Sequence, residues 1–215
     1  MFRGDDIRTQ DNTLAVLQEA KVNPTGLVGL NANLAFGCCK GCKSTQSDVI
    51  MAYTQSYLQT QVLTWVGSSE LTPPEFAHIK RPCVKLIRAL YGHPEAGWHW
   101  DKRFREVMEL MGGTHLPNFQ SSYWFSDSRM LLTLYVDDMV LSGPCENNKA
   151  FWEQLSKHLE FEEPSSVDRM LGRKQEFFQD DSGSYVGMSM EDFLESSCTA
   201  YETLTSMKIK EASAP

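Results

Sequence analysis

The stretch LLTLYVDDMVL, residues 131–141, is an apolar run interrupted at its centre by two adjacent carboxylates, Asp137 and Asp138. An apolar segment on each side of the pair predicts two β-strands joined by a tight turn. Ionised carboxylates are rarely left among buried strands unless a positive group lies beside them. We therefore expect a cation at this hairpin, and a divalent metal ion is the simplest candidate.

A plainer interpretation of the same residues is a polar hairpin turn, because Asp is common in turns. The usual two-residue turn favours Asn-Gly or Asp-Gly, and the segment VDDM, residues 136–139, holds no glycine. Two like charges without a glycine favour a functional role over a simple turn.

The composition predicts a folded intracellular protein. The chain has 215 residues, of which 41% are hydrophobic and 11% aromatic, enough for one packed domain or one domain with a small appendage. It has no apolar stretch of the roughly 20 residues that cross a bilayer, and its first residues lack a secretory apolar segment. We expect a cytoplasmic or nuclear protein that is neither secreted nor inserted in a membrane.

Six cysteines are scattered along the chain, and in this setting reduced thiols are a better prediction than a disulfide framework. Cys39 and Cys42 have a Cys-x-x-Cys spacing next to Cys38, yet no second Cys/His pair follows at a finger-like distance. A structural zinc site needs four ligands. A small zinc-binding interaction module is therefore the weaker alternative for this segment.

The formal net charge of −8 argues against a protein whose whole surface grips nucleic acid, because Lys and Arg make most phosphate contacts. It does not exclude an enzyme that acts on nucleic acid, since the basic residues are concentrated in a few segments.

Hydrophobic spacing and turn signals predict a series of helices and strands. Ser189, with Asp192 three residues later, has the pattern of a capping box. Helices are expected over residues 13–20, 27–36, 95–111, from about 148, and from 189. Strands are expected over residues 61–66, 84–87 and 123–125 and in the hairpin, and residues 47–53 are expected to form a buried strand that runs into a turn or helix. This order indicates an α+β fold rather than alternating βαβ units.

A third carboxylate, Asp48, lies beside apolar neighbours and is expected to converge with Asp137 and Asp138. Three such aspartates suit a polymerase, in which two magnesium ions about 3.5–4 Å apart lower the pKa of a 3′ hydroxyl and neutralise the triphosphate. Magnesium prefers hard oxygen ligands of this kind.

Four blocks carry a resemblance to a known family. YVDD, residues 135–138, resembles the Tyr-x-Asp-Asp box of reverse transcriptases. DVIMAY (48–53), KLIRALYG (85–92) and MLG (170–172) are similar to blocks of the Ty1/copia-type retrotransposon enzymes, and Trp100 falls near the Ala-Trp of that family. The blocks occur in family order and cover most of the chain from Asp48 to Arg173.

The resemblance implies an α+β fold made of a polymerase palm, an antiparallel sheet with flanking helices, plus part of the fingers. Residues 1–180 would form fingers and palm, with fingers incomplete at the N-terminus, and residues 181–215 a C-terminal connection with a terminal helix. The implied activity is RNA-directed DNA synthesis, with an RNA template, a DNA primer and deoxynucleoside triphosphates as partners. The chain would act without a membrane, within a longer Pol polyprotein if it is expressed as one.

The resemblance also implies the site. Asp48, Asp137 and Asp138 would be catalytic, and together with Val49 they would hold two Mg²⁺ ions, which Mn²⁺ could replace. Tyr53 would select the sugar by clashing with a 2′ hydroxyl, and Tyr135 would lie near the primer terminus; a plain core role is the alternative for each tyrosine.

This chain also departs from the family pattern. Glu95 stands where the family has a glutamine that lines the nucleotide pocket, and a carboxylate there is unfavourable beside a triphosphate unless it points elsewhere or binds metal. Most of the basic fingers strand would lie upstream of Met1, and no RNase H segment follows within the 215 residues. The alternative is therefore an inactive, truncated retroelement remnant that at most binds nucleic acid.

Overall fold

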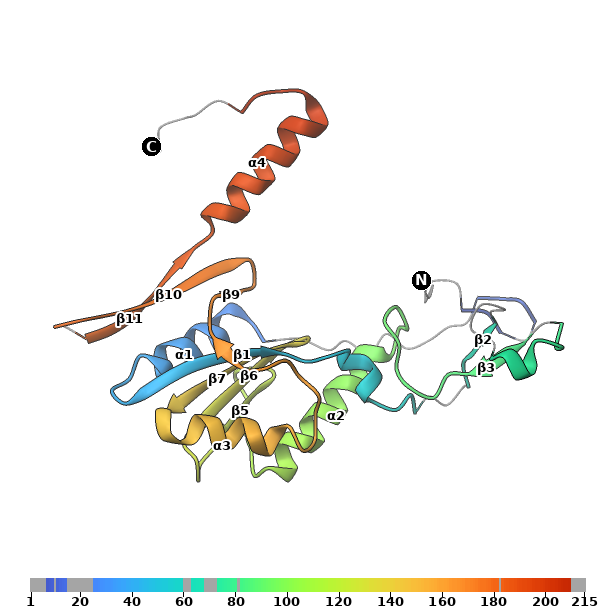
Figure 1. Ribbon diagram of the computed structural model, residues 1–215, viewed down its shortest axis with the longest axis horizontal. Coiled ribbons are helices and arrows are strands. Elements are labelled where there is room, and N and C mark those ends of the chain that lie inside the picture. Colours follow the sequence, from blue (N-terminus) through green and yellow to red (C-terminus); the bar gives the residue numbers. More distant parts are fainter. Residues whose placement is uncertain are drawn as a thin grey trace.

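The computed structural model describes residues 7–9, 11–14, 25–59, 63–67, 73–80, 82–181 and 183–209. Within these ranges the chain has a mixed α+β fold with four α-helices, and its strand pairs are antiparallel (Figure 1). The predicted α+β class is confirmed. Most of the helix expected over residues 13–20 falls outside the described residues.

A six-stranded antiparallel sheet with the order β4-β5-β6-β7-β1-β8 forms the centre of the molecule. Its strands are β1 (Cys42–Asp48), β4 (Thr114–His115), β5 (Ser122–Phe125), β6 (Met130–Tyr135), β7 (Asp138–Pro144) and β8 (Ser165–Ser166). The predicted hairpin of residues 131–141 is β6–β7. Apart from its first residue, β7 is buried throughout, because it is paired on both edges and covered on both faces. Burial of both faces explains a continuous apolar run rather than an alternating one.

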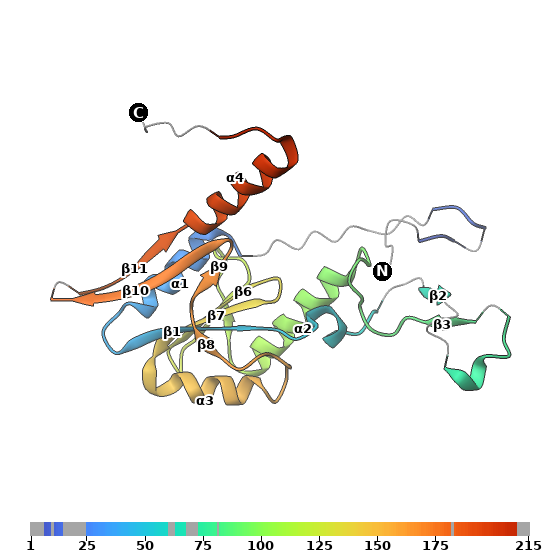
Figure 2. The same ribbon diagram turned by 45° about the horizontal axis from the view of Figure 1, so that its top comes forward.

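Helices cover both faces of this sheet. On one face, α2 (Ala96–Leu110) and α3 (Cys145–Leu155) form the larger core with β5, β6 and β7. On the other face, α1 (Leu27–Gly37) places Leu30 and Leu34 against Val140. Figure 2 shows α1 and α3 on opposite sides of the strands. The sheet is thus a middle layer between helices, and the ends of its strands are available to form a site.

The spacing of apolar residues predicted α1 and α2 correctly, and α2 ends just before Gly112 as expected. The strand expected over residues 47–53, running into a turn or helix, is confirmed only in part, because β1 already ends at Asp48. After it, Met51 has a left-handed φ of 48°, and residues Ala52–Gln55 form the 3-10 helix η2. Such a φ interrupts a strand.

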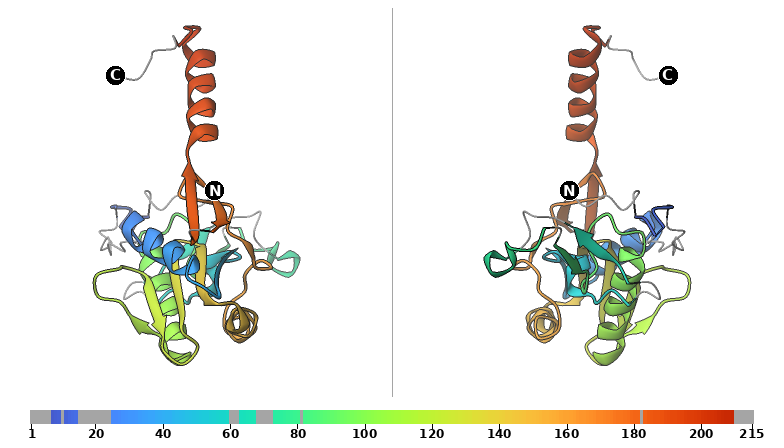
Figure 3. Two further views of the ribbon diagram at one scale, coloured as in Figure 1. Left: turned by 90° about the vertical axis from the view of Figure 1, so that its left-hand side faces the viewer. Right: turned by 90° about the vertical axis from the view of Figure 1, so that its right-hand side faces the viewer.

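Two shorter parts lie at the ends of the molecule. A two-stranded sheet pairs β2 (Trp65–Gly67) with β3 (Cys83–Lys85), shorter than the strands predicted there, and the 3-10 helix η3 (Pro74–Phe76) lies between them. At the C-terminal end, β9 (Arg169–Met170), β10 (Arg173–Asp180) and β11 (Gly183–Ser189) form a three-stranded sheet, from which α4 (Glu191–Thr205) projects (Figure 3). The domain division expected at residue 180 falls at the turn of the β10–β11 hairpin.

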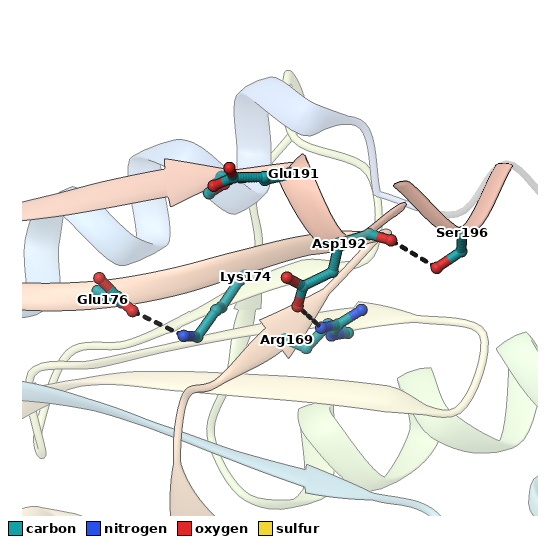
Figure 4. Close-up of polar contacts among 7 residues, drawn as sticks. Arg169, Lys174, Glu176, Glu191, Asp192 and Ser196 are labelled. Atoms are coloured by element: carbon teal, nitrogen blue, oxygen red, sulfur yellow. Dashed lines mark hydrogen bonds and ion pairs between the residues drawn. The ribbon is translucent and has the colours of Figure 1, made fainter. Parts of the chain in front are cut away.

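The capping box predicted at Ser189 is only half formed. The residue before α4 is Met190, which makes no side-chain cap, and Ser189 Oγ accepts a hydrogen bond from Glu191 N at 3.1 Å. Asp192 instead forms an ion pair with Arg169 (Figure 4). In the part of the chain that is described, no helix is both long and apolar enough to cross a membrane.

Candidate carboxylate site

The register of three neighbouring strands places two carboxylates side by side. Asp48, the last residue of β1, lies opposite Asp138, the first residue of β7, and Asp138 also lies opposite Tyr135 on β6. Residues directly opposite one another on paired strands point to the same face of a sheet. The three side chains therefore form a row across one end of the sheet, with Asp138 in the middle.

The turn between β6 and β7 consists of Val136 and Asp137, so the Asp pair is not itself the turn that the sequence suggested. Val136 has a φ of 59°, which is unfavourable for a β-branched residue. Two contacts hold it: Trp100 Nε1 donates to the Val136 carbonyl at 2.7 Å, and Val49 N donates to the Asp137 carbonyl at 2.8 Å. Backbone strain of this kind persists where the surroundings fix it, often at functional sites.

The electrostatics of the row favour a shared proton. Burial, a hydrogen bond with Asp48 and the charges of Asp48 and Asp137 raise the pKa of Asp138 to about 6. Two carboxylates that share a site resist double ionisation. Asp138 therefore holds a proton below about pH 6, and at neutral pH its charge beside Asp48 favours a cation.

Asp137 faces a pair of tyrosines. The rings of Tyr53 in η2 and Tyr91 lie with their centroids 4.4 Å apart. Burial raises the pKa of both hydroxyls, and the charge of Asp137 raises it further. The segments DVIMAY and KLIRALYG, separate in sequence, therefore meet beside Asp137. Tyr91 belongs to the KLIRALYG block, but the sequence alone did not indicate a role for it.

The other two predicted nucleotide or primer residues lie in different surroundings. Tyr135 is partly buried against the cluster of Leu30 and Val140 under α1. Glu95 precedes α2, and its carboxylate lies 3.8 Å from Nε2 of the buried His99. Burial lowers the pKa of His99, and Glu95 offsets only part of this effect. The Glu95 carboxylate thus has a polar neighbour, His99, one turn further along α2.

The carboxylate row offers two oxygen donors to a metal ion rather than a complete set of ligands. Among the residues that the structure describes, no three His, Cys, Asp or Glu side chains converge closely enough to hold one. Asp48 and Asp138 do come together, and their hard carboxylate oxygens fit a divalent cation such as Mg²⁺, whose remaining ligands are commonly water and substrate phosphates. The six cysteines are free thiols, as predicted.

An antiparallel sheet covered by helices on both faces, with paired carboxylates at the ends of its central strands, defines an α+β domain with an acidic site suited to a cation. Residues 30–210 match the family described as reverse transcriptase (RNA-dependent DNA polymerase). Because this match covers most of the chain, the protein belongs to that family. No curated protein matches it.

Proposed function

We propose that this chain is the palm, with part of the fingers, of a copia-type RNA-directed DNA polymerase, and that Asp48, Asp137 and Asp138 carry its nucleotidyl transfer. The observation that supports this most strongly is the β1–β7 register, which sets Asp48 against Asp138. Membership of the reverse transcriptase family agrees with it.

Each residue then has a definite task. Asp48 and Asp138 would supply the carboxylate oxygens for a cation, which would compensate the paired charges that help to raise the pKa of Asp138. Asp137, whose backbone carbonyl accepts a hydrogen bond from Val49 N, would supply the third carboxylate as a metal ligand. When bound, two Mg²⁺ ions would lower the pKa of the primer 3′ hydroxyl and neutralise the triphosphate.

Tyr53 would lie under the sugar of the incoming nucleotide, with Tyr91 supporting its ring from behind. A ring held in this way cannot withdraw from an added 2′ hydroxyl, so the pair would select deoxynucleotides. Substituting Tyr53→Val should raise the ratio of ribonucleotide to deoxynucleotide incorporation, and Tyr91→Leu should raise it less. An unchanged ratio in both variants would assign the tyrosines to the core alone.

Primer extension on an RNA template with Mg²⁺ tests the activity. We expect Asp48→Asn and Asp137→Asn to lose at least about 100-fold in rate, since each removes a charged metal ligand. Asp127→Asn is the matched control, because Asp127 lies in the turn between β5 and β6, away from the β6–β7 turn. Equal rates in all variants would refute the assignment, and an inactive wild type with intact folding would identify the chain as an inactive remnant.

A further inference from the structure

Four of the six cysteines lie at one end of the central sheet, where α1 meets β1 and where β7 meets α3: Cys38, Cys39, Cys42 and Cys145. In the sheet, Cys42 lies opposite Pro144, the residue before Cys145. Figure 1 shows the connection between α1 and β1 at the end of β1 away from η2. Asp48 and Asp138 lie at the other ends of β1 and β7, so these thiols are separate from the carboxylate site.

The turn between α1 and β1 brings two of these cysteines close together. Cys42 N donates to the Cys39 carbonyl at 2.9 Å, which closes a four-residue β-turn. Gly41, the third residue of this turn, has a φ of 78°, as a type II turn requires. The first and last Cα atoms of a β-turn lie less than about 7 Å apart, and those of a disulfide usually lie about 4.4–6.8 Å apart. The Cys-x-x-Cys spacing therefore places Cys39 and Cys42 within reach of a disulfide bond.

Backbone contacts on both sides hold this turn in place. Cys145 N donates to the Gly41 carbonyl at 2.9 Å, which extends the pairing of β1 with β7 by one residue into the turn. On the other side, the N–H groups of Cys38 and Cys39 donate to carbonyl groups of α1 at 3.1 Å. Cys39 and Cys42 are therefore the two ends of an anchored turn rather than parts of a free loop.

The two thiols of the turn differ in exposure. Cys39 is exposed, whereas Cys42 is partly buried. Burial raises the pKa of the Cys42 thiol, and the charges of Cys39 and Cys145 raise it further. Because the thiolate is the attacking species, Cys42 is a slow nucleophile toward a reagent in solution, but it needs no encounter to react with a neighbouring sulfur. Cys39 is thus placed to react first and Cys42 second.

A metal ion fits these cysteines less well than a disulfide does. A structural zinc site needs four ligands, and among the residues that the structure describes no three Cys, His, Asp or Glu side chains converge closely enough to hold a metal. Thiol–disulfide exchange needs only a pair of thiols. Lys40 and Lys43 are exposed and adjacent in sequence to Cys39 and Cys42, which favours an anionic reagent such as glutathione disulfide.

We propose that Cys39 and Cys42 form a thiol–disulfide exchange site that takes a low-molecular-weight disulfide as its reagent. Cys39 loses its proton to water, and its thiolate attacks one sulfur of the reagent, which forms a mixed disulfide and releases one thiolate of the reagent. Cys42 then loses its proton and attacks the Cys39 sulfur, which releases the other. The two released thiolates take up the two protons, so two protein thiols are oxidised while one reagent disulfide is reduced to two thiols.

Incubation of the folded full chain with glutathione disulfide, followed by alkylation and tryptic mass mapping, tests the site. Trypsin cuts after Lys40 and Lys43, so the expected disulfide joins residues 22–40 to residues 41–43. Cys39→Ser should lose this cross-link. Cys42→Ser should trap the mixed disulfide, with at least about tenfold more glutathione on residues 22–40 than in the wild type, because the intramolecular step is absent.

Two variants serve as controls. Cys38→Ser keeps the pair and should retain the cross-link within about twofold of the wild-type yield. Cys83→Ser/Cys198→Ser removes two exposed thiols in β3 and α4 and should leave the cross-link unchanged. Circular dichroism confirms folding of each variant.

A cross-link between Cys42 and Cys145, or loss of the cross-link in Cys38→Ser, would overturn the assignment of the pair. So would glutathione spread evenly over the exposed cysteines of the wild type without any cross-link, or stoichiometric zinc in the purified chain. The site does not rest on the proposed function, and primer extension by the chain has no bearing on the cross-link. The two assignments therefore fail separately.

Discussion

The molecule contains two long hairpins that differ in packing and in turn chemistry. The β6–β7 hairpin lies inside the six-stranded sheet, with Leu132 and Leu141 completely buried. The β10–β11 hairpin belongs to the small C-terminal sheet, and its Phe178 and Tyr185 stack on one another while remaining 43% and 49% exposed. Of the two hairpins, the buried one carries the candidate catalytic residues Asp137 and Asp138.

The less favourable turn belongs to the buried hairpin, whereas stability alone would favour an unstrained turn in both hairpins. At the exposed hairpin, Gly183 has the φ of 146° that suits glycine, and its N–H donates to Asp180 Oδ1 at 3.2 Å. At the buried hairpin, a valine has the left-handed φ and the following residues are two carboxylates. The difference teaches that a surrounding core allows a turn to hold strained and like-charged residues, which an isolated hairpin would not tolerate.

The largest predicted effect is on the free energy of unfolding, and it should differ between the two hairpins because their side chains differ in burial. Leu141→Ala leaves a cavity in a strand paired on both edges, so we expect it to reduce the free energy of unfolding by about 2–5 kcal/mol. Tyr185→Ala removes a half-exposed ring and should cost less than about 1 kcal/mol. Urea denaturation measures both. A similar cost for the two variants would mean that the C-terminal sheet belongs to the same cooperative core.

The burial difference also explains what the sequence could predict. The continuous apolar run of β6–β7 and the helical spacing in α1 and α2 are strong signals, because each reflects the core that the element contacts. Strand β10, with the sequence RKQEFFQD, has no such pattern, since most of its side chains are exposed. The two-residue strands β4, β8 and β9 depend on their neighbours rather than on their own sequence.

The same reasoning applies to the sites. The convergence of Asp48 with Asp137 and Asp138 was expected from the metal chemistry that three aspartates suit, and the β1–β7 register sets Asp48 opposite Asp138. The contact of Glu95 with His99 follows from a spacing of four on a helix and could have been found. The cleft lined by Tyr57, Arg88 and Lys102 could not, because these residues belong to separate segments, and the isolated Tyr57–Arg88 bridge that joins two of them has no sequence pattern of its own.

The second predicted effect is a pH dependence of stability that arises from the carboxylate of Asp138. Because the folded protein raises the pKa of Asp138 from 3.8 to about 6, the folded state binds more protons than the unfolded state between these values. The stability contributed by this group is therefore lost as pH rises through that window. Asp138→Asn should stabilise the metal-free protein by about 1–2 kcal/mol at pH 8, a figure reduced for partial exposure, and by much less at pH 4.

Urea denaturation in EDTA at the two pH values measures this effect. Asp180→Asn is the matched control at the exposed hairpin, since it keeps an oxygen that can accept from Gly183, and should change stability by less than about 0.5 kcal/mol. Adding Mg²⁺ should stabilise the wild type more than Asp138→Asn. A pH-independent difference between Asp138→Asn and wild type would show that the carboxylates do not interact as described.

The third predicted effect is a change in stability that has opposite signs at the two turns. Val136→Gly relieves the left-handed φ and should stabilise the protein by about 0.5–1 kcal/mol, because the relief exceeds the entropy cost of glycine. Gly183→Ala introduces strain where a Cβ has open space, and should destabilise by about 1 kcal/mol. Thermal unfolding of both variants measures the signs, and equal signs would contradict the comparison of the turns.

The smallest effect concerns how α4 is attached. Arg169 and Asp192 form an ion pair although their side chains are 50% and 60% exposed, and exposed pairs contribute at most about 1 kcal/mol. Arg169→Ala should therefore leave global stability nearly unchanged and increase amide hydrogen exchange only in the first turn of α4. Salt should produce the same local increase in the wild type, because it screens the pair.

Lys149→Ala, which removes the exposed partner of Glu153 on α3, is the control for this experiment. Its helix packs into the larger core through Phe151 and Leu155, so exchange there should not change. Faster exchange in β6 and β7 on Arg169→Ala would show that α4 is coupled to the strands that carry the aspartates. The two hairpins would then be one cooperative unit, and the strained turn would owe part of its support to the C-terminal sheet.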